Sequence, residues 1–355
     1  MGTFSDTTVL VLIAVVKIAV VLTVLLTIIA YTTWLERKVV AHIQSRWGPY
    51  LVGPHGLLQP VADGAKFILK EEIVPAEADK PIYWLAPLLG FVLALLSIAV
   101  IPFGEGFTLY GHPIQFQITD LNVGLLFVFA VTSLGVYSIA LAGWSSNSKY
   151  PLLGGLRSSA QMISYELSLG LAVIGALMMA GTLSLRGIVN AQSGFWHIAG
   201  VNTWVPHWYV FVQPIGFFVY FTSAIAETNR VPFDLPEGET ELVGGFHTEY
   251  SSMKFAMFFM SEYANMVTVS CLATLLFFGG WHGPVFGPKI VQIILPLFWF
   301  CLKVFCFMFF YIWMRGTLPR FRYDQLMSLG WKFLLPLGLL NILVTSFLIA
   351  WRGGS

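Results

Sequence analysis

Eight stretches of about 20 mainly apolar residues restrict the fold of this sequence more than any other feature. A helix of that length crosses the hydrocarbon core of a bilayer and satisfies its own backbone hydrogen bonds there. The stretches do not alternate apolar and polar residues, as barrel strands would. We therefore predict an all-α polytopic membrane protein, a single membrane domain over residues 1–355 with about eight transmembrane helices. The predicted spans are 9–33, 82–102, 121–142, 159–181, 208–226, 253–280, 290–314 and 333–351.

The composition supports this fold class and excludes others. Of the 355 residues, 57% are hydrophobic and only 10% are charged, whereas soluble globular domains carry about 25% charged residues. The chain is also too apolar to be intrinsically disordered. A formal net charge of +1 gives no general basic field, so nucleic acid is not an expected partner. No small-residue cleavage pattern follows the first apolar stretch, so we expect it to be retained as a span.

Lysine and arginine residues are distributed unequally between the two sides of the predicted bundle. The loops after the odd-numbered spans, 34–81, 143–158, 227–252 and 315–332, hold thirteen of them. The other side holds three, namely Arg186, Lys289 and Arg352. Because cytoplasmic loops carry an excess of these residues, we predict that the four loops face the cytoplasm and that both termini lie outside. A bacterial cytoplasmic membrane is the expected location, ahead of an organellar inner membrane.

The first of these loops contains an amphipathic segment. Apolar residues recur at the spacing of one helical face, and Asp63 lies three residues before Lys66, close enough to pair with it. The segment is too short to span, so we predict a surface helix that lies along the membrane. It is either a solvated surface helix or a lid over a cavity at the interface. The apolar positions are Leu58, Val61, Ala62, Ala65 and Leu69.

The loop at 227–252, called the acidic loop below, has six carboxylates and one cation, Arg230. Like charges held close together raise carboxylate pKa values, so protons could exchange at working pH. A freely solvated loop is the alternative. Apolar residues interleave with the acids, however, and Pro and Gly residues shape the backbone, which favours a loop that folds back against the membrane domain. The carboxylates are Glu227, Asp234, Glu237, Glu239, Glu241 and Glu249.

Glu166, Glu262 and Lys303 are among the ionisable residues inside predicted spans, where such residues are expensive and usually functional. Counted from the predicted cytoplasmic ends, Glu166, Glu262 and Lys303 lie roughly 12, 14 and 18 Å deep at 1.5 Å per residue. Each one alone could be a structural ion-pair partner. Together they predict a polar track from the acidic loop to the middle of the membrane, as a proton relay requires.

Motifs for redox cofactors are missing from the sequence. The three cysteines form no CxxC pair and cannot ligate a four-cysteine iron–sulfur cluster. The sequence also contains no GxGxxG, GxxxxGK[ST] or HExxH motif. We therefore expect this chain to hold no metal, flavin, nicotinamide or nucleotide, and any electron transfer to reside on partner chains.

Six segments together resemble, in order and spacing, the H-subunit family of bacterial respiratory complex I, whose mitochondrial counterpart is NADH dehydrogenase subunit 1. The resemblance covers essentially the whole chain, and the acidic-loop motif is its most specific part. The segments are ERKVVAHIQSRWGP, GLLQPVADGAKFILKE, SYELSLG, AETNRVPFDLPEGETELVGGFHTEY, FFMSEYANM and RGTLPRFRYDQLM.

This resemblance implies a quinone-binding subunit of a proton-pumping NADH:quinone oxidoreductase translocase, part of the respiratory electron transport chain. In the family, the subunit forms most of a tunnel that admits ubiquinone or menaquinone from the bilayer. FMN and iron–sulfur clusters are carried by partner subunits, and the quinone is the substrate. By motif position, the tunnel would be lined by Glu36, Arg37, Arg46, Asp63, Lys66 and Phe67.

The resemblance also implies an acidic route from the quinone toward neighbouring antiporter-like membrane subunits. The residues assigned to this route by motif position are Glu166, Glu227, Asp234, Glu237, Glu239, Glu241, Glu249 and Glu262, with Arg157 and Lys303 at matching charged positions. The segment RFRYDQLM, together with Arg315, would help to form the interface with the soluble arm.

Two other functions fit parts of the sequence. The corresponding membrane subunit of a membrane-bound hydrogenase or related dehydrogenase would keep parts of the acidic loop but would need no quinone tunnel. A stand-alone proton-coupled transporter would also use buried acids, but it usually shows an internal repeat, and none is visible here. Identification of co-purifying partners or of bound quinone would separate these alternatives.

Overall fold

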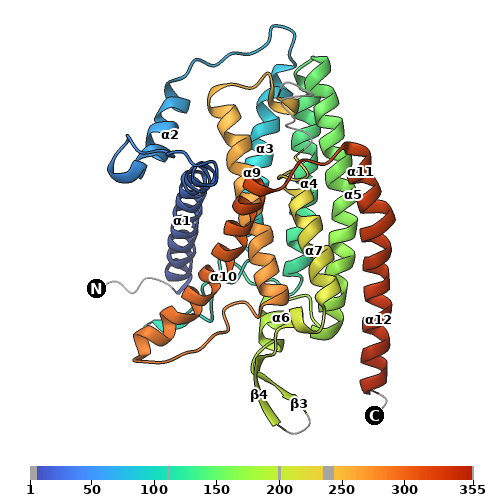
Figure 1. Ribbon diagram of the computed structural model, residues 1–355. Coiled ribbons are helices and arrows are strands. Elements are labelled where there is room, and N and C mark those ends of the chain that lie inside the picture. Colours follow the sequence, from blue (N-terminus) through green and yellow to red (C-terminus); the bar gives the residue numbers. More distant parts are fainter. Residues whose placement is uncertain (1–5, 110–111, 199–200, 235–243, 354–355) are drawn as a thin grey trace, which may run out of the picture.

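The computed structural model describes residues 6–109, 112–198, 201–234 and 244–353. Its helices form a bundle in which α1 begins and α12 ends at the same end (Figure 1). The long helices are α1 (Asp6–Ile43), α3 (Lys80–Ile98), α4 (Gly124–Ser145), α5 (Lys149–Ala180), α7 (Pro214–Glu227), α9 (Ser252–Phe277), α10 (Lys289–Thr317) and α12 (Leu335–Gly353).

Shorter elements connect these helices. They are η1 (Pro54–Gly56), α2 (Gln59–Leu69), α6 (Leu185–Ala191), η2 (Tyr209–Phe211), η3 (Gly245–His247), α11 (Tyr323–Ser328) and the π-helical η4 (Leu329–Leu334). Two antiparallel hairpins join the helices at the end where α1 begins (Figure 1). They pair β1 (Phe107–Leu109) with β2 (His112–Ile114) and β3 (Phe195–Ile198) with β4 (Val201–Pro206).

The predicted all-α membrane fold is confirmed, with one difference in the fifth span. Seven described segments are long and apolar enough to cross a membrane. The span predicted at 208–226 is instead a 14-residue helix, α7, whose length of roughly 21 Å is below the roughly 30 Å hydrocarbon thickness. Pro214 stands in its first turn, where proline is tolerated because that N–H has no helical partner. The preceding residues form the 3₁₀ turn η2 instead.

Two helices extend beyond the predicted membrane boundaries. The helix α1 continues to Ile43, ten residues past the predicted end at 33, because neither Gly nor Pro interrupts residues 34–43. Likewise, α5 begins at Lys149 rather than at 159. The predicted loops 34–81 and 143–158 therefore start or end as helix, and their charged side chains have fixed directions. The predicted amphipathic helix is confirmed as α2.

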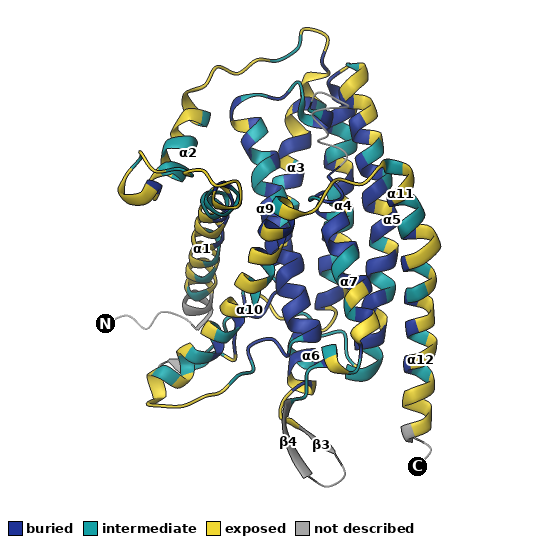
Figure 2. Cartoon of the chain, viewed as in Figure 1, coloured by how far each residue is buried: buried dark blue, intermediate teal, exposed yellow. Residues whose placement is uncertain are grey.

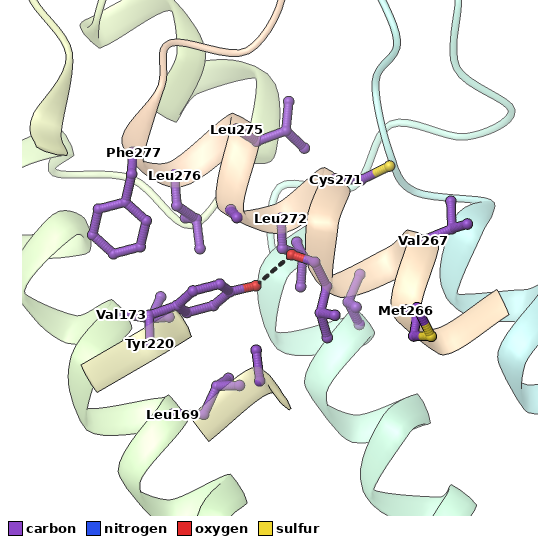
Figure 3. Close-up of a cluster of buried hydrophobic side chains, with 14 of the residues drawn as sticks. Leu169, Val173, Tyr220, Met266, Val267, Cys271, Leu272, Leu275, Leu276 and Phe277 are labelled. Atoms are coloured by element: carbon purple, nitrogen blue, oxygen red, sulfur yellow. Dashed lines mark hydrogen bonds between the residues drawn. The ribbon is translucent and has the colours of Figure 1, made fainter. Parts of the chain in front are cut away.

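The core lies between α3, α4, α5, α7 and α9, with α12 packed on α5 and α7 (Figure 1). The helix α9 is the most enclosed, whereas α1, α10 and α12 expose apolar side chains, as lipid-facing helices do (Figure 2). Figure 3 shows the centre of this core, where the hydroxyl of Tyr220 on α7 donates to the carbonyl of Val269 on α9 at 2.8 Å. Leu169 of α5 and Phe277 of α9 are among the buried apolar residues around it.

Candidate functional site

Buried charges meet where the ends of α1, α7 and α10 approach α9. The Nε of Arg230 lies 2.6 Å from Oε1 of Glu262, and its Nη1 lies 3.4 Å from Oε1 of Glu36. The guanidinium of Arg315 also contacts the carboxylate of Glu36. Tyr263 donates its hydroxyl to Oε2 of Glu36 at 2.6 Å, and its ring lies 4.3 Å from the Arg230 guanidinium. These five residues are called the charged cluster below.

Because the cluster is buried, its carboxylates and guanidinium groups must pair with one another for the charges to be stable. Glu36 is 5% exposed and Arg230 is 7% exposed. An isolated charge at such a depth would be far less stable than in water. Two carboxylates and two guanidinium groups balance one another here, so the cluster carries no excess charge when all four groups are ionised.

The turn after α7 places Arg230. Its backbone is held on α5 by Gln161, whose Nε2 donates to the carbonyls of Ala226 at 2.8 Å and Phe233 at 2.9 Å. Asn229 donates from Nδ2 to the hydroxyl of Ser158 on α5 at 3.1 Å. The arginine therefore projects from a buried, hydrogen-bonded turn, which fixes the side chain between α1 and α9.

A small internal cavity of about 50 Å³ adjoins the cluster, and this volume exceeds what one water molecule requires. Glu262 and Glu227 both line the cavity, together with His247 from η3. Among the described residues, Oε2 of Glu227 is buried without a hydrogen-bond partner. Such an acceptor is normally satisfied by water, so the cavity is suited to hold water between two carboxylates.

Glu166 extends this series of acids along α5. Its carboxylate accepts a hydrogen bond from the hydroxyl of Ser133 on α4, and it is close enough to Glu227 for electrostatic interaction. The structure thus places Glu262, Glu227 and Glu166 in one region of the bundle, next to Glu36 of the charged cluster, which the family resemblance had assigned to the tunnel.

A family model described as NADH dehydrogenase matches residues 16–346. The chain belongs to this family. It is 60% identical to the second NADH-quinone oxidoreductase H subunit of Koribacter versatilis, over 96% of this chain and 97% of the relative. It is 52% identical to the first H subunit of Solibacter usitatus with the same coverage. The H subunit of Thermomicrobium roseum is 51% identical over 95% of this chain and 96% of that relative. The family resemblance inferred from the motifs is confirmed.

The predicted tunnel residues lie mainly on the outer side of α1 and on α2. Arg37 and Oδ2 of Asp63 are 2.6 Å apart, and Lys66 is 4.0 Å from Oδ1 of the same carboxylate. The Lys66 contact confirms the predicted pairing along α2. The ring of Phe67 lies 6.2 Å from that of Phe255 on α9, so α2 connects α1 with α9. Arg46 follows α1 and donates from Nε to Gln44 at 2.7 Å.

Several residues of the predicted acidic route lie apart from the charged cluster. Asp234 pairs with Arg320 at 3.1 Å, and Arg157 on α5 lies 5.7 Å from the ring of Tyr323 on α11. The backbone carbonyl of Glu249 accepts from the hydroxyl of Tyr83 at 2.7 Å. Glu237, Glu239 and Glu241 fall outside the described residues.

Lys303 lies at the far end of α9 from the charged cluster. Its ammonium donates to the carbonyls of Phe278 at 2.7 Å and of Gly280 and His282 at 2.8 Å. These carbonyls follow the last turn of α9, sixteen residues or more beyond Glu262, which corresponds to roughly 24 Å along a helix. The common depth expected for Lys303 and the two glutamates is therefore not what the structure shows, and the lysine caps a helix terminus.

Sequence reasoning did not assign three residues that the structure places in or next to the site. Arg230 was recognised only as the single cation of the acidic loop, and Arg315 only as an interface residue. Tyr263 follows Glu262 directly, and a phenol beside an acid inside an apolar span was the available signal. Within the part of the chain that the structure describes, no group of three His, Cys, Asp or Glu residues could hold a metal ion.

Proposed function

We propose that this chain is the quinone-binding membrane subunit of an NADH:quinone oxidoreductase, and that its buried carboxylates couple quinone reduction to proton translocation. The relatives described above are named as quinone oxidoreductase subunits, which favours this function over that of a hydrogenase subunit. In this proposal, electrons reach the quinone from a cluster in a soluble partner subunit, and antiporter-like membrane subunits receive the coupled charge displacement.

One observation carries the proposal, namely that two consecutive residues on α1 point in different directions. Arg37 pairs with Asp63 on α2, where the tunnel is expected. Glu36 points into the bundle and contacts Arg230. Adjacent helical residues lie about 100° apart around the axis, so one helical turn joins the proposed tunnel wall to the charged cluster.

The chemistry gives this connection a role. Reduction of a quinone takes up two electrons and two protons, and negative charge develops on the headgroup before the protons arrive. Within a low-dielectric chamber that charge acts over several ångströms. It would draw Arg37 away from Asp63 and change the balance at Glu36 and Arg230. Proton exchange between Glu262 and Glu227 through the cavity then provides the first step away from the quinone.

The route is tested by neutralising its acids in the assembled complex. Glu262→Gln and Glu166→Gln should each lower quinone reductase activity and proton pumping together. Glu105→Gln, which changes an exposed carboxylate in the loop after α3, is the matched control and should leave both unchanged. Wild-type rates in both buried variants would overturn the proposal.

The tunnel is tested separately. Asp63→Asn should impair quinone turnover because it removes the anion opposite Arg37, while NADH oxidation by an artificial soluble acceptor stays nearly intact. Asp120→Asn, an exposed change in the loop before α4, serves as the control. An equal fall in both activities of the Asp63 variant would refute a tunnel role.

A further inference from the structure

A second hollow opens on the surface where α2 ends and where α3 and α9 begin. It has a volume of about 590 Å³, within the range of sites for small ligands. We call it the interfacial groove. Both helix starts lie at the cation-rich end of the bundle (Figure 1), which places the groove at the predicted cytoplasmic surface of the membrane. It is lined by Ile68, Lys70, Glu72, Pro81, Trp84, Leu85, Pro87, Leu88, Ser252, Met253, Lys254 and Met257.

A buried ammonium forms the polar end of the groove. Lys254 is 3% exposed, and its Nζ lies 2.7 Å from Oε1 of Glu72 and 3.5 Å from the centre of the Trp84 ring. The distance to Glu72 is that of an ion pair, but Nζ makes no hydrogen bond of good geometry among the described residues. An ammonium has three N–H donors, and the one carboxylate beside it does not use them all.

Further positive charge surrounds this ammonium. Lys70 lines the same groove, so the lining contains two lysines and one carboxylate, that of Glu72. The first turn of α9 also begins here, and its N-cap residue Ser251 gives it no side-chain hydrogen bond. Free amides and the helix dipole at such a terminus favour an anion. The helix terminus therefore adds to the positive potential of the two lysines, which Glu72 offsets in part.

The remaining wall is apolar and continues down α3. Trp84, Leu85 and Leu88 share one face of the helix, at a spacing of three and four residues, and each is about half-exposed. Met253 and Met257 of α9 stand opposite them in the lining. The groove thus has a cationic end at the membrane surface and an apolar face that runs into the membrane.

Hydrogen bonds hold the polar end in place. The hydroxyl of Ser252 donates to the carbonyls of Phe67 at 2.8 Å and Lys70 at 3.1 Å. The hydroxyl of Ser251 accepts from the amide of Ile73 at 2.9 Å. The segment after α2 is therefore fixed on the start of α9, and the two lysines are held near each other before any ligand binds.

We propose that the interfacial groove binds one anionic phospholipid. Its phosphate interacts with Lys254 and Lys70, and an acyl chain lies along Leu85 and Leu88. A transmembrane helix of a partner subunit would fill the apolar face but would leave the two lysines without an anion. This site is separate from the charged cluster, and the proposal does not depend on quinone reduction.

The test uses the assembled complex in phosphatidylcholine vesicles that contain phosphatidylglycerol with a photoreactive acyl chain. Labelling should map to the α3 peptide that contains Leu85 and Leu88. Lys70→Gln, an exposed change that should not disturb folding, and Lys254→Gln should each lower the labelling about tenfold, the effect of losing one hydrogen bond to a charged group. Lys289→Gln, an exposed change at the opposite end, is the control.

A steric variant completes the experiment. Leu88→Trp fills the groove while keeping both lysines, and it should also abolish labelling. The proposal is overturned if all variants are labelled like the wild type. It is equally overturned if a photoreactive phosphatidylcholine labels the α3 peptide as well as the phosphatidylglycerol does. A crosslinker placed at position 88 that captures only a protein chain would show that a partner helix occupies the groove instead.

Discussion

Neutralising Glu36 provides the sharpest test of how the charged cluster is balanced. Glu36→Gln leaves the guanidinium groups of Arg230 and Arg315 opposite the single carboxylate of Glu262, so one positive charge is in excess. Removing one partner of a buried ion pair costs about 3–5 kcal/mol. The glutamine oxygen still accepts a hydrogen bond from a charged donor, which returns about 1.5–3 kcal/mol. We expect a net loss of about 2 kcal/mol in the free energy of unfolding.

A second substitution should recover part of this loss. Arg315→Gln in the Glu36→Gln background restores equal numbers of positive and negative charges. Because the side chain of Arg315 is 42% exposed, its charge is partly screened, and the recovery should be about 1 kcal/mol. Alone, Arg315→Gln should be mildly destabilising, since it leaves an excess negative charge.

The assay is the amount of this chain in membranes together with the thermal midpoint of the purified complex. A loss of about 2 kcal/mol changes the ratio of folded to unfolded chain about 30-fold, so abundance should respond clearly. Arg37→Gln in the same background is the control, because Arg37 contacts Asp63 outside the cluster and should bring no recovery. A double variant that is as unstable as Glu36→Gln, or a single variant as stable as the wild type, would refute the charge-balance reasoning.

Three further outcomes are expected. Lys303→Met should lower the thermal midpoint, by the equivalent of about 2 kcal/mol for a lost charged cap, while the number of protons pumped per quinone stays unchanged; a lower number would place Lys303 on the proton route. Gly154→Ala should destabilise by about 1–3 kcal/mol, measured by the same midpoint, because the new methyl group would lie 2.8 Å from the backbone of Gly245. Burial raises the pKa of Tyr250 to about 12. The protonated phenol therefore contributes fully to the free energy of unfolding below pH 10, and this contribution is lost between pH 10 and 12. An alkaline unfolding titration of Tyr250→Phe should lack this loss, and a titration identical to that of the wild type would contradict the reasoning.

Much of the fold could be predicted because the membrane sets the length of each helix. The apolar runs predicted eight spans, of which seven are long helices in the part of the chain that the structure describes, and the stripe from Leu58 to Leu69 predicted α2. The fifth span was overestimated because residues 208–213 are as apolar as a span, whereas Pro214 fixes where the helix begins. The end of α1 was placed too early and the start of α5 too late, because hydropathy marks the limit of the bilayer and not the limit of a helix.

The composition of the site could be predicted only in part. A charge within an apolar run stands out, which pointed to Glu166 and Glu262. Glu227 was found as a member of the acidic loop, and Glu36 only through the family resemblance, as a tunnel residue. Their pairing could not be predicted, because Glu36 and Arg230 are 194 positions apart and only the packing of α1 against α9 brings them together. Lys303 stood out in the same way, but its position in the sequence did not reveal that its ammonium binds the carbonyls that follow α9.

The contacts of Arg37 and Glu36, on different sides of α1, also have a mechanical consequence. Arg37 holds this helix to α2 and Glu36 holds it to the turn after α7, so a small rotation of α1 about its axis lengthens one contact as it changes the other. Because α1 packs mainly against α9 and α10 and otherwise exposes apolar side chains, such a rotation disturbs little of the core. A headgroup that displaces Arg37 could therefore act on the bundle by turning a helix as well as through its charge.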